Sequence, residues 1–109
     1  MPYDEPTADR IRKILKRTKG IEEKKMFGGL AFMLNGHMAC GVLDTTLVLR
    51  LGNEGAAKAL KEKHTRPMDF TGKPLKSMVY VDPKGFKTDA ALKAWVKCAV
   101  DHARSLPPK

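Results

Sequence analysis

An Asn35-Gly36 dipeptide between two apolar segments places the tightest constraint on what this chain can fold into. A two-residue type I′ hairpin turn needs positive φ at both central positions, which asparagine and glycine tolerate better than other residues. The flanking segments, residues 26–34 and 37–43, are apolar at most positions. The sequence therefore predicts an antiparallel hairpin, and the lack of polar alternation predicts that both faces of its sheet are covered.

Three helices are predicted from apolar residues at helical spacing. The first follows Pro6, a favoured residue in a first turn, and is expected to end at Gly20. A short second helix is expected to begin at Asn53, a good N-cap residue. The third is the clearest, because an apolar stripe of full width follows the N-cap Thr88. This stripe includes Trp95, which we expect in the core.

Two further strands complete the predicted fold. Residues 46–51 alternate apolar and polar side chains, and residues 77–81 are rich in strand-forming types. The predicted order is α-β-β-β-α-(β)-β-α, in which the last strand is formed by residues 77–81. Residues 66–76 are expected to form an irregular, basic connection. The fold class is therefore α+β, with an antiparallel sheet and three helices. A chain of 109 residues is expected to form one domain, spanning 1–109.

The charge of the chain is strongly positive and predicts an anionic partner. Lys and Arg number 21 against 12 Asp and Glu, which gives a net charge of +9. On the first helix, the basic residues fall opposite the apolar stripe. They are the candidate residues for binding nucleic acid or another anionic partner: Arg10, Arg12, Lys13, Lys16, Arg17 and Lys19. The alternative interpretation is a solvated helix face without a partner.

No motif in the sequence proposes a reaction. The Gly28-Gly29 pair precedes a strand and lacks the spacing of a phosphate-binding loop. Cys40 lies among apolar neighbours, where a thiol is poorly ionised. Cys98 and His102 are four residues apart on one helix face, but no second ligand pair accompanies them. We expect no catalytic residue, no metal and no cofactor, and a thiol- or metal-dependent enzyme is kept as a distant alternative.

The sequence also indicates a compartment. No apolar segment approaches the roughly 20 residues that span a bilayer, and no signal peptide is visible. Two cysteines are compatible with free thiols in a reducing environment. We therefore expect a cytoplasmic protein that makes no membrane contact.

Several segments resemble the N-terminal domain family of the TfoX/Sxy competence regulators. The matching residues are Met26-Phe27-Gly28-Gly29-Leu30-Ala31-Phe32-Met33-Leu34-Asn35-Gly36-His37-Met38, Cys40-Gly41-Val42, the segments 47–51 and 66–74, and Ala94-Trp95 with 103–107. The resemblance implies a fold similar to type III secretion chaperones, in which a curved antiparallel sheet packs against helices. Full regulators of this kind carry a second, helical domain, and this chain is expected to hold the first domain only.

The resemblance and the basic surface together suggest a function. We expect a non-enzymatic regulatory or interaction module that acts through protein contacts, with a possible protein partner in transcription regulation. The alternative is a general nucleic-acid-binding protein that uses the basic face of the first helix. We also expect a homodimer, because residues 30–34 and 38–43 are apolar on both faces and only three helices are predicted to cover them.

Overall fold

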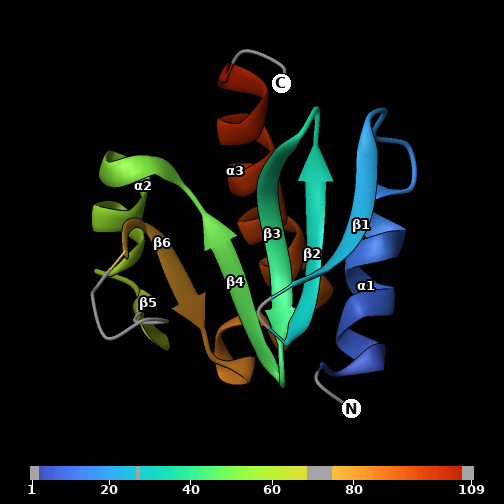
Figure 1. Cartoon of the computed structure of the whole chain (residues 1–109). Helices are drawn as coiled ribbons and strands as arrows, with labels where there is room; N and C mark the ends of the chain where they lie inside the picture. The colour runs from blue at the N-terminus through green and yellow to red at the C-terminus, as the bar shows by residue number, and fades with distance from the viewer. Residues whose placement is uncertain (1–2, 27, 69–74, 107–109) are drawn as a thin grey trace.

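The computed structural model describes residues 3–26, 28–68 and 75–106, and within these ranges it has three α-helices and one six-stranded sheet (Figure 1). The helices are α1 (Glu5–Leu15), α2 (Gly52–Ala59) and α3 (Asp89–Ser105), and none of them is long and apolar enough to cross a membrane. The strands are β1 (Ile21–Met26), β2 (Gly29–Leu34), β3 (His37–Leu43), β4 (Thr46–Arg50), β5 (Thr65–Met68) and β6 (Leu75–Val81), and a 3-10 helix, η1 (Pro83–Phe86), precedes α3. All strand pairs are antiparallel, in the order β1-β2-β3-β4-β6-β5. The predicted α+β fold class is confirmed.

The predicted hairpin is confirmed between β2 and β3. Asn35 has φ 52° and Gly36 has φ 87°, as a type I′ turn requires. Leu34 pairs with His37 across the turn. Buried residues occupy nearly every position of both strands, as their continuous apolar composition predicts.

The prediction of one strand over residues 26–34 is wrong, because the chain breaks at Gly28 and forms two strands there. Gly28 has φ 75°, a backbone conformation that glycine adopts without strain. The strand before the break, β1, pairs along its whole length with β2. Its four central residues are charged and exposed, so this strand lacks the alternation of apolar and polar residues that would have predicted it. Phe27 lies outside the described residues.

Two predicted helix boundaries are also wrong. Helix α1 ends at Leu15 and not at Gly20: the Thr18 N–H donates to the Leu15 carbonyl at 2.9 Å, and the chain turns back so that Ile21 can pair with Leu34. Helix α2 begins at Gly52, which places Asn53 inside its first turn and not at its N-cap. By contrast, Thr88 caps α3 as predicted, since its hydroxyl accepts from the Ala91 N–H at 3.1 Å.

The bracketed strand of the predicted order is β5, at the edge of the sheet. Pro67 is acceptable there because an edge strand has one side without ladder hydrogen bonds. Arg66 fixes the strand to its neighbour: its guanidinium carbon lies 4.7 Å from the Tyr80 ring centroid, and its Nε lies 3.1 Å from an Asp82 carboxylate oxygen. The prediction of an irregular connection over residues 66–76 is wrong at both ends, because residues 66–68 belong to β5 and residues 75–76 to β6. Residues 69–74 lie outside the described residues.

The main core lies between the sheet and the helices. Figure 1 shows α1 and α3 behind the sheet, and α2 joins the same core through Ala56 and Ala59. Of the described residues, Phe32 of β2 is one of the two phenylalanines that are fully buried there, and it is 1% exposed. Trp95 is only partly buried against this core, so the prediction that it is a core residue is wrong. The indole of Trp95, a residue of α3, borders a surface cleft that is described below.

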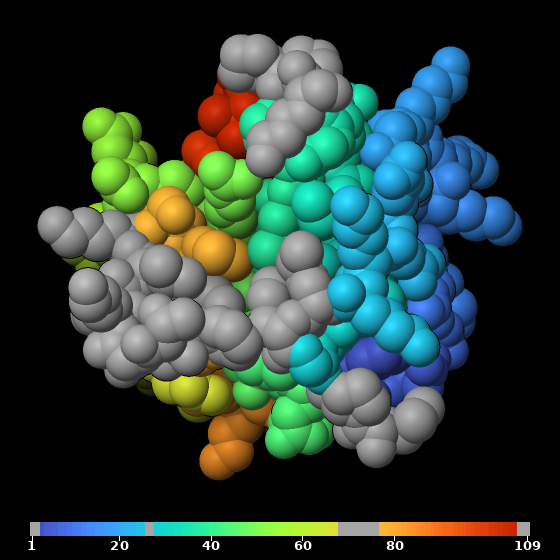
Figure 2. Space-filling view, in the orientation of Figure 1, coloured from blue at the N-terminus to red at the C-terminus, as the bar shows by residue number. Residues whose placement is uncertain are grey.

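The opposite face of the sheet, which is toward the viewer in Figures 1 and 2, carries a second and smaller apolar cluster. Its buried members are Ala31, Met38, Val48 and Tyr80, and each is at most 9% exposed. Among the described residues, the large apolar side chain that is clearly exposed is Leu60, which follows α2. The buried members of this cluster are thus covered within the chain itself, and homodimerisation stays a prediction.

Candidate anionic-partner interface

The structure divides the six predicted cationic residues into three groups. Arg10 and Arg12 lie on opposite flanks of α1 and are partly buried in ion pairs. Lys13 is exposed on the outer side of the helix. The remaining three follow the last helical residue, in the turn that leads to β1: Lys16, Arg17 and Lys19. The six residues therefore do not form one continuous helix face.

Arg10 fastens α1 to the beginning of α3. Its Nη2 donates to the Phe86 carbonyl at 2.8 Å and to the Lys87 carbonyl at 3.2 Å, and its Nε lies 3.3 Å from an Asp89 carboxylate oxygen. The guanidinium carbon also lies 5.8 Å from the centroid of the Phe86 ring. These contacts use much of the donor capacity of Arg10, so its main role is to position the two helices.

Arg12 is held by three carboxylates on the other flank of α1. Its Nε and Nη2 contact Glu23 of β1 at 2.8–3.1 Å, and its Nη1 contacts Asp9 at 2.6 Å and Glu5 at 3.5 Å. The hydrogen bonds to Glu23, followed by those to Asp9, raise the pKa of Arg12 above its usual value. The charge of Arg12 is therefore neutralised within the chain, and this residue is a poor candidate for binding a partner.

A cleft of about 390 Å³ lies between α1 and the first turns of α3. Its lining consists of Arg10, Lys13, Ile14, Asp89, Ala90 and Lys93. The Arg10–Asp89 pair is neutral, which leaves Lys13 and Lys93 as two exposed ammonium groups without an ion-pair partner in the part of the chain that the structure describes. The positive end of the α3 dipole adds to their potential. The cleft therefore combines positive charge with an apolar floor.

The contribution of Lys93 was not predicted from the sequence. Lys93 lies on α3, 80 positions after Lys13, and only the packing of α1 on α3 brings the two together. Helical spacing within α3 places Lys93 outside the apolar stripe, which identifies an exposed position but no neighbour. The sequence therefore contains no signal that Lys13 and Lys93 line the same cleft.

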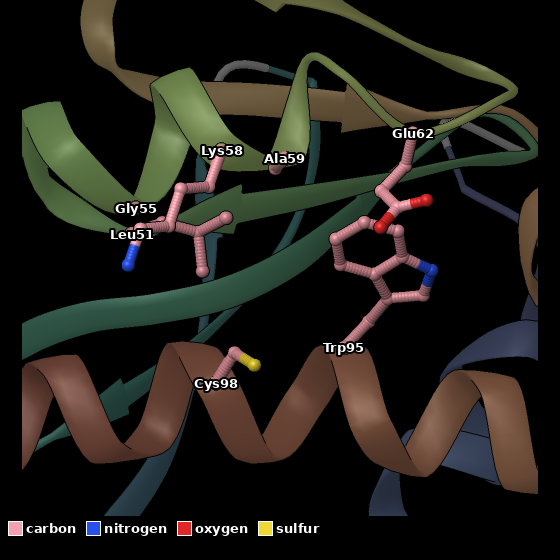
Figure 3. A pocket seen from close by; sticks show the side chains of 7 residues that line it. All are labelled: Leu51, Gly55, Lys58, Ala59, Glu62, Trp95 and Cys98. Carbon is pink, nitrogen blue, oxygen red and sulfur yellow. The ribbon is translucent and has the colours of Figure 1, made fainter.

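A second cleft, of about 260 Å³, lies between α2 and α3. Figure 3 shows Trp95 and Cys98 on α3, facing Leu51 and the α2 residues, with the Glu62 carboxylate beside the indole. The Trp95 Nε1–H donates to the Gly85 carbonyl at 3.1 Å, which fixes the ring. The lining also includes Gly55, Lys58 and Ala59. No histidine lines this cleft, so the described residues provide Cys98 with no imidazole base there.

The other residues considered for thiol or metal chemistry form no group of three metal ligands in the part of the chain that the structure describes. Cys40 is fully buried, and burial raises the pKa of its thiol to about 12, which confirms that it is poorly ionised. His102 of α3 lies close to Gly52, away from the lining of the second cleft. In the described ranges, no three His, Cys, Asp or Glu side chains are arranged to hold a metal ion.

His102 makes the stability of the fold depend on pH. Partial burial, followed by the charges of Arg50 and His37, lowers the pKa of His102 below its ordinary value of 6.5. Below pH 6.5 the unfolded chain therefore takes up a proton before the folded chain does, and the free energy of unfolding falls as the pH is lowered. We expect His102→Gln to reduce this fall in urea titrations measured at several pH values.

The matched control is His64→Asn, since His64 is exposed and its positive φ suits asparagine. This control should leave the dependence on pH unchanged. An equal fall with pH in His102→Gln and in the unmodified chain would show that His102 does not cause it.

Comparisons with known proteins give one result. The family model of the TfoX N-terminal domain matches residues 13–103, which includes the end of α1, the whole sheet, α2 and most of α3. No curated protein and no solved structure matches the chain. The family assignment therefore rests on this one match, and it agrees with the α+β fold.

Proposed function

Because the chain belongs to the TfoX N-terminal domain family, we propose that it is a non-enzymatic, cytoplasmic interaction module that acts in regulation. Its partner would be a protein that presents an acidic segment, and the binding site would be the cleft between α1 and α3. The regulatory part of the proposal is supported by the resemblance to the competence regulators. The binding part is supported by the chemistry of the cleft.

The single observation that carries the proposal is the combination of charge and apolar surface in this cleft. Lys13 and Ile14 line it from α1, and Ala90 and Lys93 line it from α3. A segment that carries carboxylates and an apolar side chain would pair with the two ammonium groups and cover Ile14, which is partly buried. Apolar and charged side chains lie side by side in many protein interfaces.

The alternative partner, nucleic acid, is less well supported by the structure. Arg10 and Arg12 already bind groups of the chain itself, so fewer cations remain to contact phosphates. Binding of single strands also uses exposed aromatic rings on which bases stack. None of the described residues that line the α1–α3 cleft is aromatic. The remaining cations, Lys13 and the three in the following turn, could still bind a duplex without sequence preference.

The two candidate functions can be separated by titrating the chain into two labelled probes. One is a peptide of alternating Glu and Leu residues, and the other is a DNA duplex; fluorescence anisotropy reports binding to each. We expect tighter binding of the peptide. Tighter binding of the duplex, with log K falling by about 3.6 per decade of salt for about four phosphate contacts, would instead support the nucleic-acid function. Binding of neither probe at low salt, where screening is least, would contradict both.

A further inference from the structure

Strand β1 lies at one end of the sheet and pairs with β2 alone among the described strands. A terminal strand leaves a row of backbone N–H and C=O groups unpaired on its outer side, which can accept another strand. In Figure 2, the light-blue residues of this part of the chain lie along the right-hand side of the molecule. The strand is six residues long, so the edge is long enough for specific pairing.

The charges on this edge are balanced, although the chain as a whole carries +9. The sequence Ile-Glu-Glu-Lys-Lys-Met of β1 has two acidic and two basic side chains, and all four are exposed. Charged side chains on an edge strand, lysine above all, usually discourage pairing with another strand. On β1 the two signs are balanced, so two copies can pair in a register that opposes glutamate to lysine.

The register of β1 with β2 shows which charges share a face of the sheet. Glu22 and Lys24 pair with Met33 and Ala31, which belong to the cluster on the face without helices. Glu23 pairs with Phe32, which belongs to the core under the helices. Glu22 and Lys24 are thus two charges of opposite sign, two residues apart, on one face.

We propose that two copies of the chain pair antiparallel through β1, about a two-fold axis at Glu23. An axis perpendicular to the sheet keeps the helices of both copies on the same side, and directly opposed residues then share a face. In this register, Glu22 of each copy lies opposite Lys24 of the other copy, so the contact contains two equivalent pairs of opposite charge. The sheets of the two copies join into one.

The side chains that meet at the two-fold axis favour the register centred on Glu23 over the register centred on Lys24. At the centre, Glu23 of one copy faces Glu23 of the other, and each already forms an ion pair with Arg12 of its own copy at 2.8–3.1 Å. A register centred on Lys24 would oppose two lysines that form no ion pair within the described ranges. Like charges directly opposed destabilise a strand pair.

A hollow beside the edge supports the same register. Ile21 is partly buried and borders a hollow of about 320 Å³ that Leu15 and Phe32 also line. In the proposed pairing, Lys25 of the second copy lies opposite Ile21 on the helix side of the sheet. The aliphatic stem of this lysine would cover Ile21, as long basic side chains commonly cover apolar surface.

Sedimentation equilibrium tests the proposal through charge reversal. Between about 10 µM and about 1 mM, the mass of the unmodified chain should rise from 12.1 kDa toward twice that value. Glu22→Lys and Lys24→Glu each replace two attractive pairs by two repulsive ones, so each should raise the dissociation constant about thirtyfold. An equimolar mixture of the two variants should regain dimers, since all four opposed side chains then have opposite signs across the contact.

Glu54→Lys on α2 is the control for Glu22→Lys, because it makes the same change of charge at an exposed position away from β1. Circular dichroism should show that all variants fold. A constant mass of 12.1 kDa for the unmodified chain would overturn the proposal. An unchanged dissociation constant in Lys24→Glu would also overturn it, because the register centred on Lys24 opposes two like charges both before and after this change. The test does not involve the α1–α3 cleft, so its outcome is independent of the proposed function.

Discussion

Replacing Phe32 with alanine is expected to lower the free energy of unfolding by about 3–5 kcal/mol. Phe32 is 1% exposed and, with Phe86, has the largest of the side chains fully buried in the core between the sheet and the helices. Its removal loses the transfer free energy of the ring and leaves a cavity that neighbouring strands cannot close, because both are fixed in the sheet. The melting temperature should fall by about 12 °C or more. Urea denaturation measures the free energy, and calorimetry measures the temperature.

Trp95→Ala provides the comparison for this result. Trp95 is the larger side chain, but it is partly buried and borders a cleft, so its removal leaves less enclosed space. It also loses one hydrogen bond to the Gly85 carbonyl. We expect a cost of about 1–2 kcal/mol. A larger loss for Trp95→Ala than for Phe32→Ala would show that the core is centred elsewhere than the structure places it.

Replacing Gly41 with valine is expected to destabilise the fold by about 3 kcal/mol, although valine favours strands and glycine does not. Gly41 pairs with Ala31 in the middle of the hairpin. A Cβ at this position would lie 2.6 Å from the Leu30 carbonyl oxygen and 3.3 Å from the Ala31 Cα, both of which are backbone atoms. Because the hairpin backbone is held by its ladder, it can relieve this contact only by distorting.

Thr46→Val is the matched control for Gly41→Val. Thr46 pairs with Leu43 in the same sheet and is only partly buried, so a β-branched apolar side chain can be placed there without a backbone contact. We expect a change within about 0.5 kcal/mol of zero. Stabilisation by Gly41→Val would contradict the prediction. It would mean that the strand propensity of valine contributes more to the free energy of unfolding than the contact of its Cβ with the β2 backbone costs.

The parts of the fold that could be predicted are those specified by local chemistry. The Asn35-Gly36 turn needs positive φ, and the Thr88 cap satisfies free N–H groups of its own helix, so both are visible in a short window of sequence. Strand β1 could not be predicted in this way. Its charged residues carry no strand pattern, and it forms because β2 offers a free edge and the turn at Gly28 returns the chain to it.

The candidate site was predicted only in part, for a similar reason. Helical spacing showed that Lys13 is exposed, and this is confirmed. It could not show that Arg10 and Arg12 bind Asp89 and Glu23, because these ion pairs join residues that are distant in sequence. For the same reason, the position of Lys93 across the cleft from Lys13 required the packing of α1 on α3. Charge is a property of the sequence, but the charge left free for a partner is a property of the fold.

The central claim, that the α1–α3 cleft binds an acidic segment, is tested most directly by reversing the two charges of the cleft. The measurement is the dissociation constant of the Lys13→Glu/Lys93→Glu variant for the Glu-Leu peptide and for the matching Lys-Leu peptide, by fluorescence anisotropy. The Lys61→Glu/Lys63→Glu variant has the same net charge and is altered only at exposed positions after α2.

The proposal predicts that reversal in the cleft weakens binding of the Glu-Leu peptide about tenfold or more and gives binding of the Lys-Leu peptide, whereas the control variant keeps the original preference. Equal weakening of Glu-Leu binding in both variants would contradict the proposal, because the net charge of the chain, and not the cleft, would then determine binding.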